Sequence, residues 1–304
     1  WLLGSSATQV ICISFVLLIA LGTLLLTLPI SSRSGRLGVV DAMFTATSAT
    51  CVTGLVVRDT WTQFTPFGQA VVLLLIQVGG LGLVTLTSFF ALAAKRRMGF
   101  KDLRLLGESV SASGYSQATD VLKIVVKLAM TFEIIGMVLL MIAFVPQFGA
   151  EGIWISAFTA ISAFCNAGFD LMGTPDMPFV SLTAYRADPV INLTISALIV
   201  VGGIGFLTWD DVRTNRLCFH RYRLQSKVIL TATALLILLP TLYFFCFEFK
   251  GGTLRERLLL SLFQSVTPRT AGFNTADYTS LSSSGRGLTI LLMFIGGSSG
   301  STAG

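Results

Sequence analysis

The stretch Phe-Thr-Ala-Ile-Ser-Ala-Phe-Cys-Asn-Ala-Gly-Phe, residues 158–169, decides how this chain is interpreted. It is too short to cross a membrane and too apolar to form an ordinary surface loop. A near-copy, Phe-Thr-Ala-Thr-Ser-Ala-Thr-Cys-Val-Thr-Gly-Leu, occupies residues 44–55. The recurrence predicts that the segment is part of an internal structural repeat.

The composition is that of an integral membrane protein. Of 304 residues, 53% are hydrophobic and 12% are charged, whereas a soluble domain carries about 25% charged residues. The five cysteines are scattered without a Cys-x-x-Cys spacing, so we interpret them as apolar filler and not as disulfide or metal ligands. A single histidine, His220, argues against a His-based zinc site or a Ser-His dyad.

Six apolar runs are long enough to cross a membrane, which takes about 20 helical residues. They cover residues 10–30, 67–94, 128–145, 190–209, 228–247, and 288 onward. The first run is too long for the apolar core of a cleavable signal, and no small-residue cleavage site follows it. Pro240 predicts a kink in the fifth run.

The positions of the basic residues predict the orientation of these runs. Two segments between the runs hold 12 of the 21 Lys and Arg residues and are therefore expected to be cytoplasmic. Their members are Lys95, Arg96, Arg97, Lys101, Arg104, Lys123 and Lys127, then Arg213, Arg216, Arg221, Arg223 and Lys227. Residues 31–66, 146–189 and 248–287 would then face outward. This topology explains the net charge of +6 without a nucleic-acid partner, and the basic segments could also contact anionic lipid or a cytoplasmic subunit.

Each outward interval contains a half-length apolar helix, predicted at residues 39–50, 152–164 and 254–266. Each half-helix leads into a glycine-containing turn: Val52-Thr53-Gly54-Leu55, Asn166-Ala167-Gly168-Phe169 and Thr270-Ala271-Gly272-Phe273. The turn glycines are 114 and then 104 residues apart. A unit of helix, half-helix, turn and helix is therefore predicted three times, with a period of about 110 residues.

A glycine cluster follows each turn, at residues 78–82, 201–205 and 295–300. A nucleotide-binding Gly-x-Gly turn would need a preceding strand and an acidic residue beyond it. These clusters instead lie in spanning runs. For the first two, we expect close packing of helices.

The half-helix and turn predict a cation site. Non-helical backbone at membrane depth is tolerated where it is buried in protein or lines a water-filled cavity. The carbonyl end of a helix carries roughly −0.5 of a charge, and carbonyls of a turn can replace the hydration shell of an ion. Glycine permits the backbone angles that point successive carbonyls to one side. The turns contain no carboxylate, which favours a weakly held monovalent cation over calcium.

These motifs, together with the final Phe-Ile-Gly-Gly-Ser-Ser-Gly-Ser-Thr-Ala-Gly, resemble the Trk/Ktr/HKT superfamily of potassium transporters, and the KtrB-type membrane subunit most of all. The resemblance covers essentially the whole chain. It implies an all-α membrane fold of helix–pore-helix–helix units, arranged pseudo-fourfold around a central ion pore. The repeats would occupy residues 1–95, 96–210 and 211–304. The fourth repeat is missing, and we expect the chain to continue past Gly304 by about 100 residues, by the repeat length.

The resemblance also implies the functional residues. The selectivity filter would comprise Val52, Thr53, Gly54, Asn166, Ala167, Gly168, Thr270, Ala271 and Gly272, with K⁺ bound by the backbone carbonyls of Thr53, Asn166 and Thr270. A flexible gating loop would comprise Gly296, Gly297, Ser298, Ser299, Gly300, Ser301, Thr302, Ala303 and Gly304. A truncated Ser/Gly helix end is the alternative interpretation of that segment. Glycine at position 54 suggests preference for potassium, because serine there accompanies sodium preference in plant relatives.

By the same resemblance, the chain is the pore-forming subunit of a potassium uptake system in the bacterial plasma membrane. It would form a homodimer, be regulated by a cytoplasmic nucleotide-binding subunit of the KtrA or TrkA type, contact membrane lipid, and contain no cofactor. Sodium could act as an activator. Conduction could be channel-like or coupled.

Two alternatives belong to other classes. A secondary active transporter built on broken helices would aim half-helix N-termini at an anion and often uses inverted repeats, whereas the repeats here are parallel. An intramembrane enzyme lacks support, because there are no paired intramembrane aspartates and His220 lies in a loop. Glu133 is a functional candidate because a carboxylate inside a span is costly, although a structural partner on another helix is the simpler expectation. Arg269 is expected to point away from the ion path and brace the third turn.

Overall fold

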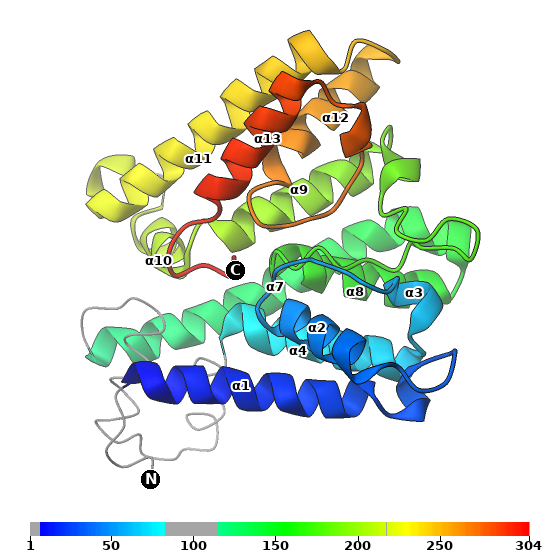
Figure 1. Ribbon diagram of the computed structural model, residues 1–304. Helices are drawn as coiled ribbons and strands as arrows, with labels where there is room; N and C mark the ends of the chain where they lie inside the picture. Colours follow the sequence, from blue (N-terminus) through cyan, green and yellow to red (C-terminus); the bar gives the residue numbers. More distant parts are fainter. Residues whose placement is uncertain (1–6, 83–114, 217, 304) are drawn as a thin grey trace.

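A computed structural model describes residues 7–82, 115–216 and 218–303 of the chain. This part of the chain is helical, and its extended pairing is limited to an isolated bridge between Ser32 and Phe64. The helices form three successive units, which follow one another from blue through green to red in Figure 1. The all-α fold predicted from the sequence is therefore confirmed.

The first unit consists of α1 (Ala7–Leu26), the pore helix α2 (Val39–Thr50), the short α3 (Thr60–Gln63) and α4 (Pro66–Leu81). Helix α2 packs against both α1 and α4. Local sequence fixes the start of α4, because Pro66 occupies its first turn and the Thr65 side chain accepts a hydrogen bond from the N–H of Gly68 at 3.3 Å. The predicted continuation of this span to residue 94 lies outside the described residues.

The second unit consists of α7 (Tyr115–Phe148), the pore helix α8 (Glu151–Phe164), α9 (Pro189–Gly203) and α10 (Phe206–Asn215). The run predicted as one span at residues 190–209 is instead broken, with α9 and α10 meeting at 96°. Gly205 lies at the break with φ of 88°, a conformation that glycine adopts without steric cost. Hydropathy reports how apolar a segment is and not the path it takes, so it gave no sign of the bend inside this run.

The third unit consists of α11 (Leu224–Tyr243), the pore helix α12 (Leu254–Val266) and α13 (Ser283–Ile295). Pro240 lies inside α11, and a π-helical segment (Phe244–Glu248) follows directly. After α13 the chain leaves the helix at Gly296 and runs back toward α10 near the centre of the molecule (Figure 1). The units contact one another through α4 with α8 and through α9 with α12.

Within the described residues, two helical stretches are long and apolar enough to cross a membrane, Val125–Phe148 and Leu224–Glu248. The bent pair α9–α10 is a third stretch if the two helices are counted as one span. Many apolar side chains on the outer surface of the helix assembly are strongly exposed, for example Leu17 at 65%, Leu238 at 66% and Phe294 at 90%. Exposed apolar surface of this kind on the outside of a helical protein fits contact with lipid.

The first two glycine clusters serve the close packing predicted from the sequence. A Cβ atom on Gly79 would lie 1.9 Å from the carbonyl oxygen of Thr50, and one on Gly202 would lie 1.9 Å from that of Phe164. Thr50 and Phe164 are the last residues of α2 and α8. Each glycine therefore lets a spanning helix contact the C-terminal end of the pore helix in its own unit. This contact fixes the position of the glycine turn that follows the pore helix.

Candidate functional site

The three glycine turns meet at one place in the molecule. A Cβ atom on Gly54 would lie 2.9 Å from the carbonyl oxygen of Ala167 and 3.3 Å from that of Ala271. One on Gly168 would lie 2.1 Å from the Ala271 oxygen, and one on Gly272 would lie 3.6 Å from the Cα of Gly168. Segments more than 100 residues apart thus come together beside the ends of three pore helices. The convergence is observed, and its use as an ion filter remains a prediction.

The backbone of the three turns follows a shared pattern. The first residues, Val52, Asn166 and Thr270, have φ of 55°, 58° and 90°. The glycines two positions later, 54, 168 and 272, have φ of 76°, 69° and 92°, while the residue between has a negative φ. Such alternation gathers successive N–H groups on one side of a segment, and leaves the carbonyls on the other.

Hydrogen bonds agree with this arrangement in the first two turns. The N–H of Thr53 donates to the Ser48 carbonyl at 2.9 Å, and the N–H of Ala167 donates to the Ser162 carbonyl at 2.8 Å. Both bonds run back into the preceding pore helix. Among the described residues, no hydrogen bond reaches the carbonyl oxygens of residues 52–54 or 166–168. Unpaired buried carbonyls cost free energy unless another group satisfies them, so these oxygens are available to a cation.

The third turn is built differently. Helix α12 ends at Val266, six residues before its turn glycine, whereas α2 and α8 end four residues before theirs. The N–H groups of Ala271 and Gly272 both donate to the carbonyl of Thr267, at 3.0 and 3.3 Å. The Thr267 hydroxyl donates to the carbonyl of Phe273 at 2.6 Å. One threonine therefore organises the third turn in place of the last helical turn.

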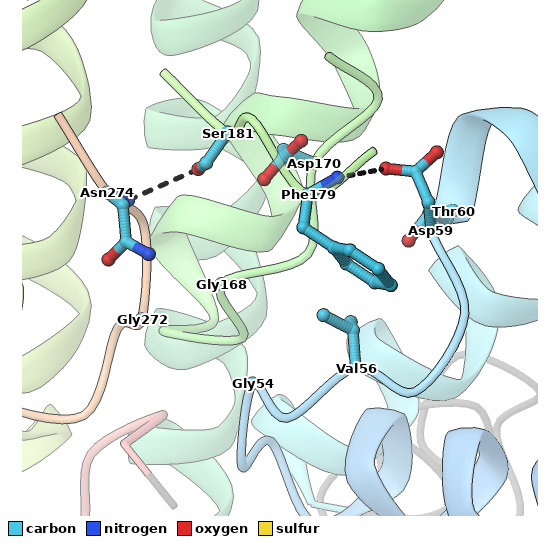
Figure 2. Close-up of a pocket in the computed structure, with 10 residues that line it drawn as sticks. All are labelled: Gly54, Val56, Asp59, Thr60, Gly168, Asp170, Phe179, Ser181, Gly272 and Asn274. Atoms are coloured by element: carbon cyan, nitrogen blue, oxygen red, sulfur yellow. Dashed lines mark hydrogen bonds between the residues drawn. The ribbon is translucent and has the colours of Figure 1, made fainter. Parts of the chain in front are cut away.

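A cavity of about 120 Å³ lies beside the three turn glycines, where the loops of the three units meet (Figure 2). Two carboxylates line it, Asp59 and Asp170. Asp59 accepts hydrogen bonds from the N–H of Thr62 at 2.8 Å and of Phe179 at 3.2 Å. Asp170 accepts from the N–H of Met172 at 3.0 Å.

The Asp170 carboxyl is enclosed by protein, and this desolvation raises its pKa to about 6. Hydrogen bonds from Met172 and Ser181 lower the pKa, and the nearby negative charge of Asp59 raises it. Sequence reasoning missed both carboxylates as site residues because it considered only the turns. Their positions, five residues after Gly54 and two residues after Gly168, were the available signal.

The loop of residues 296–303 lies against the second unit. The N–H and hydroxyl of Ser298 donate to the Gly203 carbonyl at 3.1 and 2.7 Å, and the N–H of Thr302 donates to the Gly202 carbonyl at 3.2 Å. In return, the N–H of Phe206 donates to the Gly300 carbonyl at 2.8 Å. The break between α9 and α10 therefore holds the predicted gating segment, of which Gly304 lies outside the described residues.

The two charged candidates have structural partners. Glu133 on α7 is 5% exposed and accepts hydrogen bonds from the Gln77 side chain on α4, at 3.0 Å to Oε1 and 3.3 Å to Oε2. This is the expected partner on another helix. Arg269 donates to the Gly296 carbonyl at 3.3 Å and to the Thr233 hydroxyl at 3.4 Å. Arg269 therefore hydrogen-bonds to the loop of residues 296–303 and to α11, and not to a turn carbonyl.

A second cavity, of about 520 Å³, is lined by residues of both the first and the third turn. Residues 53–56 line it together with Thr267, Pro268, Thr270, Gly272 and Asn274. In the described part of the chain, no group of three or more His, Cys, Asp or Glu side chains could hold a metal ion.

These features define a class: a multi-pass helical membrane protein whose pore helices deliver backbone turns to a common point. The chain belongs to the TrkH family, described as cation transport proteins, which it matches over residues 4–304. The predicted family, fold and location in the plasma membrane are thereby confirmed.

Named relatives agree with this assignment. The chain is 42% identical over 309 residues to the potassium/sodium uptake protein NtpJ of Enterococcus hirae, covering 98% of this chain and 66% of the relative. It is 43% identical over 302 residues to Ktr system potassium uptake protein B of Bacillus subtilis, covering 97% and 66%. The potassium transporter TrkH of Vibrio parahaemolyticus shares the fold, with a TM-score of 0.69 at 18% identity, covering 99% of this chain and 59% of that one. The chain thus spans about two thirds of the length of the two sequence relatives.

Proposed function

We propose that this chain forms most of the ion pathway of a potassium uptake protein. The observation that carries the proposal is the meeting of three left-handed glycine turns at the carbonyl ends of three pore helices. Each helix end contributes roughly −0.5 of a charge, and turn carbonyls can take the place of the water lost by K⁺. The names of the two sequence relatives, a potassium/sodium and a potassium uptake protein, support the choice of ion.

In this proposal the filter consists of residues 52–54, 166–168 and 270–272, with the carbonyls of Thr53, Asn166 and Thr270 among the ligands. A fourfold pore has a fourth turn, and the 520 Å³ cavity lined by the first and third turns is where it fits. The carboxylates of Asp59 and Asp170 at the outer mouth would attract cations and not anions. The inner loop, residues 296–304, is the gate.

The same proposal includes a homodimer and a cytoplasmic nucleotide-binding regulator, which rest on the family resemblance. Entry of K⁺ would be driven by the membrane potential, about 2.3 kcal/mol per charge per 100 mV. Sodium is the proposed activator, in line with the name of the Enterococcus hirae relative, a potassium/sodium uptake protein. A transporter for anions is disfavoured because the pore helices present their C-termini to the site, and an enzymatic role has no support from the site chemistry.

Gly54→Ser in the full-length protein tests the proposal. Cells without their own potassium uptake would be assayed for ⁸⁶Rb⁺ uptake and for its inhibition by Na⁺. A Cβ on Gly54 would lie 2.9 Å from the Ala167 carbonyl oxygen and 3.3 Å from the Ala271 carbonyl oxygen, so these backbone carbonyls would have to shift. We expect uptake to be reduced and the remaining uptake to show a weaker preference for K⁺ over Na⁺.

Gly38→Ser is the matched control, because Gly38 directly precedes the same pore helix and has no atom within 4 Å of its ideal Cβ position. It is expected to behave as wild type. If Gly54→Ser protein reaches the membrane and keeps its ion preference, residue 54 is not part of a filter.

A further inference from the structure

Thr302, in the inner loop, joins that loop directly to the second turn. Its hydroxyl donates a hydrogen bond to the Phe164 carbonyl at 2.7 Å and accepts one from the Asn166 side-chain amide at 3.1 Å. Thr302 is 2% exposed and Asn166 is fully buried. The two hydrogen bonds therefore form away from water. The Asn166 amide and the Phe164 carbonyl also contact each other, but at a long 3.5 Å, so loss of the Thr302 hydroxyl would leave both buried groups poorly satisfied.

Both hydrogen-bond partners of Thr302, Phe164 and Asn166, lie where the backbone of the second turn needs support. Phe164 is the last residue of α8, where carbonyls have no partner within the helix. Asn166 is the first residue of the turn and has φ of 58°, a conformation that side-chain-bearing residues adopt at a cost. A hydroxyl supplies one donor and can also accept, so a single side chain stabilises both points.

The other two turns lack this support. Val52, the equivalent of Asn166 in the first turn, has no side-chain hydrogen-bonding group. The hydroxyl of Thr270, its equivalent in the third turn, is buried without a hydrogen-bond partner. In the part of the chain that the structure describes, the inner loop thus hydrogen-bonds to the second turn through the side chains of Thr302 and Asn166. The three turns are therefore not equivalent.

Thr302 is itself held in place by the second unit. Its N–H donates to the Gly202 carbonyl at 3.2 Å, and a Cβ on Gly202 would lie 2.7 Å from its hydroxyl oxygen. The hydroxyl is therefore confined between α9 and the end of α8. A shift of the loop would move the hydroxyl away from Phe164 and Asn166 together.

We infer that Thr302 is a positioning residue for the second turn, so that the inner loop helps to set the preference for K⁺ over Na⁺ in addition to obstructing the pathway. The inference rests on the proposed function, because it concerns the same turn acting as a filter. The inference links the position of the loop to the spacing of the turn carbonyls. When Thr302 makes its two hydrogen bonds, the carbonyls of residues 166–168 are held at the spacing that suits K⁺. When the loop moves, Asn166 loses the shorter of its two side-chain hydrogen bonds and keeps the 3.5 Å bond to Phe164, and the spacing of the carbonyls relaxes.

The test compares Thr302→Val, which keeps the shape but removes the hydroxyl, with Thr302→Ser, which keeps the hydroxyl. Each is made in the full-length protein, and the Na⁺ concentration that halves ⁸⁶Rb⁺ uptake is measured with the membrane abundance of the protein. We expect this concentration to fall about fivefold in Thr302→Val, the effect of one lost hydrogen bond, and to stay within twofold of wild type in Thr302→Ser.

Thr23→Val is the control. Thr23 on α1 is partly buried, and its hydroxyl donates to the Ile19 carbonyl of its own helix at 2.8 Å. Thr302→Ala serves as a second variant if Thr302→Val is poorly inserted.

Unchanged Na⁺ inhibition in Thr302→Val or Thr302→Ala, at normal abundance, would overturn the inference and leave the proposed function standing. Loss of both variants from the membrane would also overturn it, because the hydroxyl would then serve folding and not the turn. Absence of K⁺-selective uptake in the wild-type protein would instead refute the proposed function.

Discussion

Replacing each turn glycine by alanine should damage transport in a definite order, Gly168 most and Gly272 least. All three glycines have positive φ, so each alanine carries a backbone strain of about 1–2 kcal/mol. What differs is the space at each position. The alanine Cβ would lie 2.1 Å from the nearest atom at Gly168, 2.9 Å at Gly54 and 3.6 Å at Gly272.

The distances set the size of each effect. Real Cβ atoms essentially never approach another atom within 3.0 Å, so at Gly168 the neighbouring Ala271 carbonyl must retreat by about 0.9 Å. Misplacing an ion ligand by about 1 Å is expected to cost on the order of 100-fold, as it does in enzyme sites of similar precision. At Gly272 the strain alone remains, and 1–2 kcal/mol corresponds to roughly 5- to 30-fold. Gly54→Ala should fall between the two.

The assay is ⁸⁶Rb⁺ uptake by full-length protein in cells without other potassium uptake, normalised to membrane abundance. Gly287→Ala is the control, because Gly287 lies in α13, is exposed, and has no atom within 4 Å of its ideal Cβ position. We expect it to transport like wild type. If Gly272→Ala proved as damaging as Gly168→Ala at equal abundance, the closeness of the three turns would not be what limits transport.

Two further predictions concern carboxylates. Glu133→Leu would leave the half-buried Gln77 amide on α4 without its acceptor, which should lower the free energy of unfolding by about 1–3 kcal/mol. Glu133→Gln keeps an acceptor and should change the free energy of unfolding by less than about 1 kcal/mol. Melting of the purified protein in detergent would measure both variants, and equal melting temperatures would contradict the pairing. The pKa of Asp170 is raised from 3.8 to about 6 by enclosure and by Asp59. Asp170 therefore loses its negative charge as the outside pH falls from 7 to 5. We expect the external K⁺ concentration for half-maximal uptake to rise over the same pH range. The folded state binds this proton more tightly than the unfolded state, so the associated stability is complete below pH 3.8 and is lost as the pH rises through about 6. Asp170→Asn should remove this part of the pH dependence of uptake, and an unchanged pH profile in that variant would assign the effect to another group.

The pore helices were the most predictable elements of the fold. The sequence predicted residues 39–50 and 254–266, which are the observed bounds of α2 and α12, and it missed the start of α8 by one residue. Short apolar segments that end in a glycine turn have both ends marked by local chemistry. Convergence of the three turns could also be anticipated, since repeats of one unit place equivalent parts in equivalent positions.

The long runs were harder to delimit. The third was expected at residues 128–145, but α7 extends from Tyr115 to Phe148, because a helix continues past the apolar segment into polar sequence where hydropathy gives no signal. The 96° break between α9 and α10 was missed because its glycines were interpreted as packing residues alone. The meeting of Asp59 and Asp170 at one cavity depends on how loops from two repeats approach each other, and such contacts have no sequence period.

The first position of each turn explains why three repeats with different sequences can share one geometry and still differ in role. Valine, asparagine and threonine occupy residues 52, 166 and 270, each with positive φ, and for a β-branched residue this conformation is a true outlier. Such strain persists only where surrounding contacts hold the backbone in place, here the hydrogen bonds back to Ser48, Ser162 and Thr267. Because the backbone faces the shared centre, the side chain at this position is free to meet whatever lies beside its own turn. In the second repeat that neighbour is the loop of residues 296–303, which Asn166 contacts through Thr302. A difference between side chains, and not between backbones, therefore connects this turn to that loop.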